Sequence, residues 1–442
     1  MTLCVLAGTF LLMFLGSVPV SVAVGGAAFA AMLCTMPWDA AATAAAHRMA
    51  TSLSSFTLLA IPFFILAGTL VGRGGLARRM IDFARMVSWP VPGALALADI
   101  LACTLFGAVS GSASACTSAI GSFMIPAMEK DRYDRRFAAA LTVAASGSGL
   151  LIPPSNALIV YAMVAGGVSL TDLFLAGYVP GILLALSLLP GALWVTIRNG
   201  YGTKVPRPTA RELARATAAV LPSLGMILLV VGGMVAGWFT ATEGAVVAVV
   251  YALVLAVFVY REVRWRELPG ILLETASTTG VVFLMIGTSM AMAWVFSYAD
   301  VPRRIGEALG GITTNAYLMM LLINVILLLF GTFLDLTPAV LIFTPLFLPL
   351  MERLAGGMGI TPDQMKYVFG IVMVFNNVIG LSTPPLGSTL FIGCGIARIG
   401  LSEITRPLLP MFAAMIAALL LVSFVPALSL WLPGLLKAAG KG

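Results

Sequence analysis

The chain has 442 residues, of which 60% are hydrophobic and only 10% are charged, and its formal net charge is +7. Soluble domains carry about 25% charged residues, so this composition excludes a soluble globular protein and indicates a polytopic membrane protein. The apolar runs are helical in length, far beyond the ~10 residues of a barrel strand, so we expect an all-α fold. The basic residues lie in short loops and form no patch, which disfavours nucleic-acid binding.

The first half of the chain contains two apolar segments that differ from a simple span. Residues 3–34 fit either one tilted span or two short ones around Pro19. The run at about 137–165 is long enough to cross a bilayer, which takes roughly 20 residues. Its middle reads GLLIPPSN (149–156), and prolines there leave backbone groups without partners or water. We therefore predict a broken transmembrane helix.

The second half repeats these features, including a broken helix at about 366–396. Three pairs of blocks match in the same order: FILAGT (64–69) with FLMIGT (283–288), LFGAVSGSASA (105–115) with LFGTFLDLTPA (329–339), and GLLIPPSN (149–156) with GLSTPPLG (380–387). Because the order is kept, the matches indicate an internal repeat.

The distribution of basic residues predicts that the two halves are inverted. Lys and Arg favour the cytoplasmic side of short loops, and one alternation of spans places most of them there. It requires 92–128 to enter from and return to the cytoplasm, and 314–352 to do the same from outside. We therefore predict two re-entrant helical hairpins, an N-terminal repeat (1–197), a basic cytoplasmic linker (198–215) and a C-terminal repeat (216–442).

Inverted repeats whose broken helices meet at the membrane midplane are the architecture of secondary transporters. At each break, free backbone groups and half-helix ends become available as ligands. A positive helix N-terminus suits a substrate carboxylate, and a carbonyl-rich C-terminal end suits a cation. A single proline more often marks only a kink, but two matched breaks, each beside a hairpin with a polar tip, favour a binding site.

The polar tips of the two hairpins carry the candidate chemistry. The first turns at Ser110-Gly111-Ser112 and the second near Asp335-Leu336-Thr337-Pro338. A charge inside the membrane costs at least ~2.5 kcal/mol, so Asp335 signals function by default. Asp99 also lies in an apolar stretch, but it has no counterpart in the other repeat and stays unassigned. The broken helices supply further polar groups at Ser146, Ser148, Ser155, Asn156, Asn376, Asn377, Ser382, Thr383, Gly387 and Ser388.

Four motifs carry a family resemblance: SGSASACTSAIGSFMIPAM (110–128), GLLIPPSN (149–156), FLDLTPAVLIFTPLFLP (333–349) and GLSTPPLGSTLF (380–391). They resemble the large membrane subunit, the DctM-like permease, of tripartite ATP-independent periplasmic (TRAP) transporters. The likeness covers essentially the whole chain. Two residues depart from the family pattern: Ala241 stands where the family often has proline, and Asp99 is not expected.

The resemblance implies a sodium-coupled secondary importer of an organic acid, such as a C4-dicarboxylate, sialic acid or a related carboxylate. It implies a multi-pass protein of the bacterial inner membrane that works by an elevator mechanism. A small TRAP membrane subunit and a periplasmic substrate-binding protein are the implied partners. Sodium ions are the implied coupling ions, with no other cofactor and no transition metal. The particular organic acid is not specified by the sequence.

The resemblance also implies two sodium sites, each between a hairpin tip and the broken helix of the same half. One would involve Ser110, Gly111, Ser112, Pro153 and Ser155. The other would involve Gly331, Thr337, Thr383 and Gly387. The substrate would lie between the tips, near Asn156, Asp335 and Ser382.

Two other functions remain as alternatives. A stand-alone dicarboxylate or anion symporter or exchanger of the same hairpin architecture would work without a binding protein. An intramembrane serine hydrolase could use Ser110, but serine catalysis usually needs a base, and the single histidine, His47, is predicted in a loop on the opposite side of the membrane. We therefore expect no enzymatic activity. Because the chain also lacks a phosphate-binding loop, we expect no direct ATP coupling.

Overall fold

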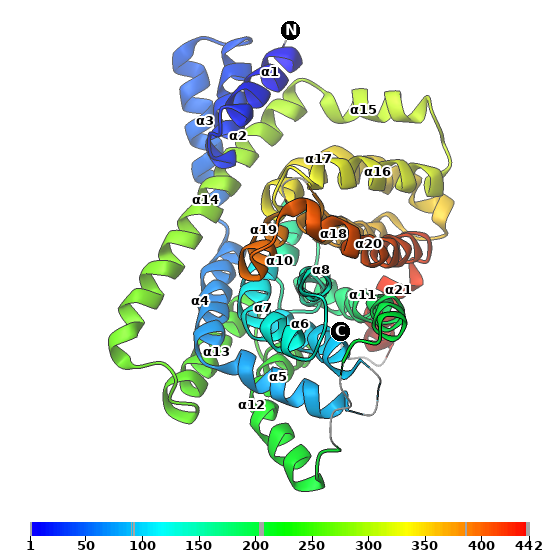
Figure 1. Ribbon diagram of the computed structural model, residues 1–442. Helices are drawn as coiled ribbons and strands as arrows, with labels where there is room; N and C mark the ends of the chain where they lie inside the picture. Colours follow the sequence, from blue (N-terminus) through cyan, green and yellow to red (C-terminus); the bar gives the residue numbers. More distant parts are fainter. Residues whose placement is uncertain (1, 90, 92, 203–206, 385–386, 439–442) are drawn as a thin grey trace.

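The computed structural model describes residues 2–89, 91, 93–202, 207–384 and 387–438, and these residues form helices and connecting turns (Figure 1). Among these described residues, seven helices are long and apolar enough to cross a membrane, or up to nine if each of two bent helix pairs is one span. The expected all-α polytopic architecture is confirmed.

The N-terminal residues form two short helices, not one tilted span, because the chain turns before Pro19, which precedes the second helix. The helices of this first part are α1 (Thr2–Leu15), α2 (Val20–Leu33), α3 (Trp38–Leu53), the 3-10 turn η1 (Phe56–Leu59), α4 (Ala60–Arg73) and α5 (Leu76–Val87). The chain bends by 65° between α4 and α5.

Each repeat contains a helical hairpin followed by a broken helix. The first hairpin is α6 (Ala94–Ser110) and α7 (Ala113–Lys130), followed by α8 (Arg135–Ser146), α9 (Ser148–Leu151) and α10 (Asn156–Ala165). The second hairpin is α16 (Ala316–Gly331) and α17 (Leu336–Leu354), followed by η4 (Ala355–Met358), α18 (Pro362–Leu381) and α19 (Ser388–Ala397). The first break bends the helix by 49°.

The remaining helices are α11 (Leu170–Asn199), α12 (Ala210–Val235), α13 (Ala241–Leu253) with its π-helical extension η2 (Val254–Val259), η3 (Trp265–Glu267), α14 (Leu268–Tyr298), α15 (Val301–Gly310), α20 (Leu401–Phe424) and α21 (Ala427–Ala438). Helix α11 therefore extends into the linker proposed at 198–215, and α12 begins inside it. The boundaries of the two repeats stay a prediction.

The helices α4 and α14 show the inverted relation of the two halves. In Figure 1, α5 leads away from the lower end of α4, whereas α15 leads away from the upper end of α14. Both α5 and α15 are amphipathic, with arginines among apolar residues. Helices of this kind lie along a membrane surface, so the two halves place such a helix at opposite ends of the molecule.

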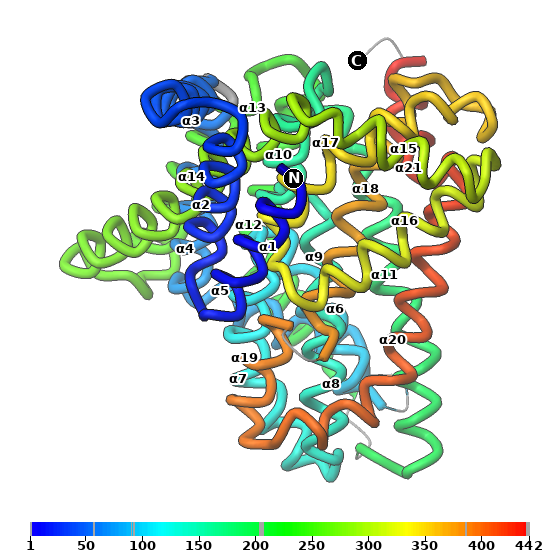
Figure 2. The backbone as a smooth tube through the Cα atoms, turned by 90° about the horizontal axis from the view of Figure 1, so that it is seen from above, coloured from blue at the N-terminus to red at the C-terminus, as the bar shows by residue number. Residues whose placement is uncertain are grey.

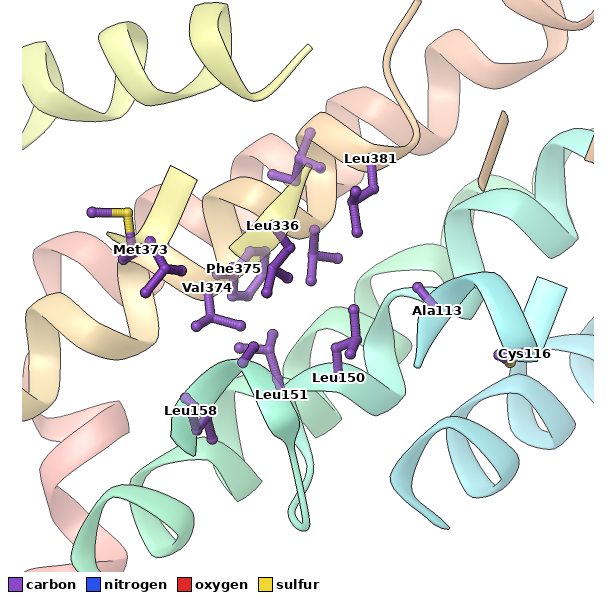
Figure 3. Close-up of a cluster of buried hydrophobic side chains, with 14 of the residues drawn as sticks. Ala113, Cys116, Leu150, Leu151, Leu158, Leu336, Met373, Val374, Phe375 and Leu381 are labelled. Carbon is purple, nitrogen blue, oxygen red and sulfur yellow. The ribbon is translucent and has the colours of Figure 1, made fainter. Parts of the chain in front are cut away.

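Besides packing within each half, the hairpins and broken helices also pack across the two halves. Helix α10 packs on α17, and α19 packs on α7 and α8. Figure 3 shows the apolar contact, where Leu150, Leu151 and Leu158 face Leu336 and Phe375. Leu151, Leu158 and Phe375 are completely buried. The two halves therefore share one hydrophobic core.

A second group of helices lies to one side of this core. Helix α14 packs on α2, α3 and α4, and α4 packs on α13. Figures 1 and 2 show α2, α3, α4 and α14 together at one side of the molecule, away from α18 and α20. The group meets the hairpin core through contacts of α4 with α6 and of α14 with α17.

Candidate functional site

A cavity of about 420 Å³ lies where the two hairpin tips approach α4 and α14. The first tip contributes Ser110–Ala115, the second contributes Asp335–Thr337, and the start of α10 contributes Asn156. Its polar and charged lining residues are Thr69, Arg73, Ser110, Ser112, Ser114, Asn156, Glu274, Thr278, Asp335 and Thr337. This volume suits a small organic molecule.

The first tip turns at Gly111, whose φ of +62° is in the left-handed region that favours glycine. Ser112 then caps α7, and its Oγ accepts a hydrogen bond from the backbone N–H of Ala115 at 3.3 Å. The tip touches the first helix break: a Cβ on Gly111 would lie 3.1 Å from the carbonyl oxygen of Pro154. The tight turn therefore places Ser110 and Ser112 beside the break.

Several buried oxygens around the first tip have no hydrogen-bond partner within the described part of the chain. They are the hydroxyls of Ser110 and Ser155 and the side-chain carbonyl of Asn156. Ser155 is completely buried and precedes α10 without capping it through its side chain. A buried polar oxygen without a partner costs roughly 1–3 kcal/mol. Hydroxyl and amide oxygens are ligands that a hard cation accepts, so this cluster fits a sodium ion.

The second tip is built differently. Asp335 caps α17, and its Oδ1 accepts a hydrogen bond from the N–H of Leu336 at 3.0 Å. The carboxylate also lines the cavity, next to Thr337. Asp335 is thus both a structural cap and the only acid that the hairpin tips contribute to the described cavity lining.

The second break also contains unpartnered oxygens. In the described residues these are the side-chain carbonyls of Asn376 and Asn377, within the last two turns of α18, whereas the Ser388 hydroxyl at the start of α19 faces the Asp335 carboxylate. Gly387 N–H donates to the carbonyl of Thr383 at 3.2 Å. Residues 385–386 of the GLSTPPLG block lie outside the described residues. Oxygens thus gather at both breaks.

A matched pair of glycines holds each hairpin against its broken helix. Gly107 of α6 faces Gly149 of α9, where a Cβ on Gly149 would lie 2.3 Å from the Gly107 backbone. Gly331 of α16 faces Gly380 of α18, where a Cβ on Gly380 would lie 2.5 Å from the Gly331 carbonyl oxygen. The four residues occupy equivalent places in the LFG and PP blocks of the repeat. Backbone-to-backbone contact therefore positions both tips.

The structure brings together about half of the residues proposed from the sequence. The cavity is lined by Ser110, Gly111, Ser112, Asn156, Asp335 and Thr337. It is not lined, among the described positions, by Pro153, Ser155, Gly331, Thr383, Gly387 or Ser382. Their roles remain predictions.

Two of these outlying residues already use their hydroxyls locally. The Ser382 hydroxyl donates to the carbonyl of Ile379 at 2.9 Å, and the Thr383 hydroxyl donates to the same carbonyl at 2.7 Å. Ser382 is only 1% exposed. Direct contact of Ser382 with a substrate would require its side chain to rotate.

Sequence reasoning missed the charged residues on the opposite wall of the cavity. Arg73 ends α4 and forms an ion pair with Glu274 of α14. In the sequence, Arg73 is one of the basic residues whose distribution predicts which loops are cytoplasmic, and nothing there marks it as a binding residue. Glu274 lies in an apolar segment, as Asp335 does. The cost of placing a charge inside the membrane, which singled out Asp335, also applies to Glu274 and would have identified it. Thr69 and Thr278 accompany them on the same two helices.

Asp99, unassigned from the sequence, joins the first hairpin to the first broken helix. It is completely buried in α6. The hydroxyl of Thr142, on α8, lies 2.8 Å from its Oδ2 and 3.0 Å from the carbonyl of Ala138. Asp99 is not a lining residue of the cavity. The geometry therefore gives Asp99 a positioning role between two helices.

This role predicts a tolerant response to loss of charge. Asp99→Asn is expected to keep transport, because its amide oxygen can still accept the Thr142 hydrogen bond. Thr142→Val leaves the buried acid without that donor and is expected to cost about 1–3 kcal/mol of stability. Thermal unfolding in detergent and uptake by proteoliposomes measure the two effects. Loss of transport by Asp99→Asn at an unchanged melting temperature would instead show that the charge serves transport.

The serine-hydrolase alternative lacks a base at the first tip. His47 lies on α3, which packs on α2 and α14. Neither a histidine nor a lysine is among the described residues that line the cavity around Ser110. Within the described lining, the Ser110 hydroxyl therefore has no histidine or lysine beside it of the kind that activates a catalytic serine.

Comparison with known proteins places the chain in a family. The family model described as "Tripartite ATP-independent periplasmic transporter, DctM component" matches residues 7–428. The C4-dicarboxylate TRAP transporter large permease protein DctM of Rhodobacter capsulatus is 33% identical, over 99% of this chain and 100% of that protein. The isethionate TRAP transporter permease protein DctMQ of Oleidesulfovibrio alaskensis is 36% identical, over 97% of this chain and 66% of that protein.

A solved structure supports the fold independently. The YdaH transporter of Alcanivorax borkumensis, described as having an unusual topology, matches with a TM-score of 0.63 at 13% identity, over 85% of this chain and 86% of that one. At this identity the likeness concerns the fold alone. The family match over nearly the whole chain, together with the hairpins and broken helices, shows that this protein belongs to the DctM family of TRAP transporter large permease subunits and is a multi-pass inner-membrane protein.

Proposed function

We propose that this protein imports a small organic anion across the inner membrane, driven by a sodium gradient. The observation that carries the proposal is the set of buried, unpartnered oxygens near the two helix breaks, of which Ser110 and Asn156 line the cavity at the first break. Two cation sites next to an anion site lower the cost of bringing a carboxylate into the membrane. Sodium binding and anion binding then favour each other.

The proposed substrate class is a small carboxylate or sulfonate. The relatives described above are named for C4-dicarboxylates and for isethionate. Sialic acid is a further carboxylate of the class expected from the sequence. The cavity offers hydroxyls, the N-terminal end of α10 at Asn156 and one guanidinium at Arg73, which together suit a small anion.

An elevator motion is part of the proposal. The crosswise packing of α10 on α17 and of α19 on α7 joins both hairpins and both broken helices into one body. Helices α2, α3, α4, α13 and α14 form the group beside it. The first body would carry the anion while the second stays in place, which exposes the cavity to alternate sides.

Sodium dependence is the first test of this function. Uptake of succinate or isethionate into proteoliposomes is expected to require an inward sodium gradient and no ATP. The chain is reconstituted with its family's small membrane subunit and periplasmic binding protein. Choline in place of external sodium is expected to abolish uptake, because the oxygen clusters would lack their cation. Undiminished uptake in choline would reject sodium coupling.

The same assay separates the tripartite importer from the stand-alone symporter or exchanger. We propose the small TRAP subunit and the periplasmic binding protein as partners, as in the DctM family. Uptake is expected to disappear when the binding protein is left out. Strong uptake of free anion by this chain by itself would favour the stand-alone transporter.

A further inference from the structure

The cavity wall opposite the hairpin tips carries a single positive charge. Three charged residues line the cavity within the described chain, namely Arg73, Glu274 and Asp335. Two of them are acids, and an organic anion near these acids needs a positive partner. Arg73 is the only basic side chain in this described lining.

The partner of Arg73 in the structure is Glu274. The guanidinium Nη2 contacts the carboxylate Oε2, from the last turn of α4 to α14. Both side chains are about half exposed, at 53% and 49%. Both side chains line the cavity, so water that enters the cavity screens their attraction, and holding two long side chains in place costs further free energy. The arginine of such a weak ion pair can exchange one carboxylate partner for another.

Arginine is suited to this exchange. Its planar guanidinium can donate two parallel hydrogen bonds to a carboxylate, and it also binds other oxyanions. Glu274 presents to Arg73 the same carboxylate group that a dicarboxylate substrate would bring. Thr69, one turn before Arg73, and Thr278, one turn after Glu274, add hydroxyls to the same wall.

We propose that Arg73 binds the transported organic anion and that Glu274 occupies its guanidinium when the anion is absent. This inference rests on the proposed function and names a specificity-determining residue of that site. Arg73 ends α4, and the segment that follows is rich in arginine, which the preference of basic residues for the cytoplasmic side assigns to the cytoplasm. The exchange therefore lies at the mouth through which the anion leaves, and Glu274 displaces the anion as it is released.

A second ion pair on the neighbouring helix provides a matched control. Arg79 of α5 pairs with Glu262 at 3.5 Å, and its guanidinium lies 3.9 Å from the ring of Tyr260. Arg79 and Glu262 are not lining residues of the cavity. Both pairs join an arginine to a glutamate, but only the first faces the hairpin tips, and Arg79 also contacts the Tyr260 ring.

The test compares four variants of the full chain, reconstituted with the small subunit and the binding protein. Exchange of internal succinate for external labelled succinate, at saturating sodium on both sides, reports on anion binding from the inner side. Arg73→Gln is expected to raise the internal succinate concentration for half-maximal exchange by about tenfold, which corresponds to ~1.4 kcal/mol. The maximal rate and the sodium response should stay close to wild type. Arg79→Gln is expected to change none of these.

The other two variants separate binding from a structural clamp. Glu274→Gln is expected to lower the half-saturating concentration, because it removes the competing carboxylate. The charge swap Arg73→Glu with Glu274→Arg would restore wild-type values if the pair only tied α4 to α14. Restoration by the swap, or an unchanged half-saturating concentration in Arg73→Gln, would overturn the inference while leaving the proposed function intact. Absence of succinate and isethionate transport by the wild-type protein would reject both.

Discussion

Gly149→Ala is expected to abolish transport and to lower the melting temperature of the purified protein. The new Cβ would lie 2.3 Å from backbone atoms of Gly107, which cannot rotate away as a side chain could. Overpacking typically costs about 1–3 kcal/mol, and the rigidity of both backbones places this substitution at the upper end of that range. Gly380→Ala is expected to act alike in the other half, because its Cβ would lie 2.5 Å from the Gly331 carbonyl oxygen.

Gly395→Ala provides the matched control for both glycine variants. Gly395 lies in α19, on the second broken helix, and a Cβ there would have no neighbour within 4 Å. Alanine favours a helix over glycine by up to ~1 kcal/mol, so this variant should be as stable as the wild type or more so. Proteoliposome uptake measures the effect of each glycine variant on transport, and thermal unfolding measures its effect on stability. Normal uptake by Gly149→Ala would show that hairpin and broken helix do not pack as closely as described.

The sequence predicted the hairpins and breaks well because their signals are local. A polar turn between apolar stretches produced the first tip at Gly111, and adjacent prolines produced the first break. The glycine contact of Gly107 with Gly149 was not predicted, because glycine in an apolar helix gives no sign of its partner. The internal repeat contained that information, since both pairs occupy aligned positions.

The composition of the candidate site was only partly predictable. Crosswise packing of α10 on α17 joins residues distant in the chain, and no local pattern specifies it. Ser382 was proposed from its place in the GLSTPPLG block. At the end of α18, however, its hydroxyl donates a hydrogen bond to the carbonyl of Ile379. Arg73 was used only as a marker of orientation, because its ion pair with Glu274 exists only in three dimensions.

Asp335→Asn is expected to reduce sodium-driven uptake by about tenfold or more, as an intramembrane charge with a functional role predicts. Asparagine caps helices about as well as aspartate, so α17 should keep its start and the protein its stability. The carboxylate that lines the cavity would repel an organic anion unless a cation lies between them. Removal of the charge should therefore raise the sodium concentration for half-maximal uptake. Arg73→Gln, in contrast, should raise the internal succinate concentration for half-maximal exchange.

Asp134→Asn is the control for the capping role of Asp335. Asp134 caps α8, where its Oδ1 accepts a hydrogen bond from the N–H of Arg136 at 2.7 Å, and it does not line this cavity. We expect its variant to transport normally with a wild-type sodium response. An unchanged sodium response in Asp335→Asn, combined with a lower melting temperature in Asp335→Ala, would reduce Asp335 to a helix cap. In that case the hydroxyl and amide oxygens at the two breaks would have to bind the coupling cation without a carboxylate.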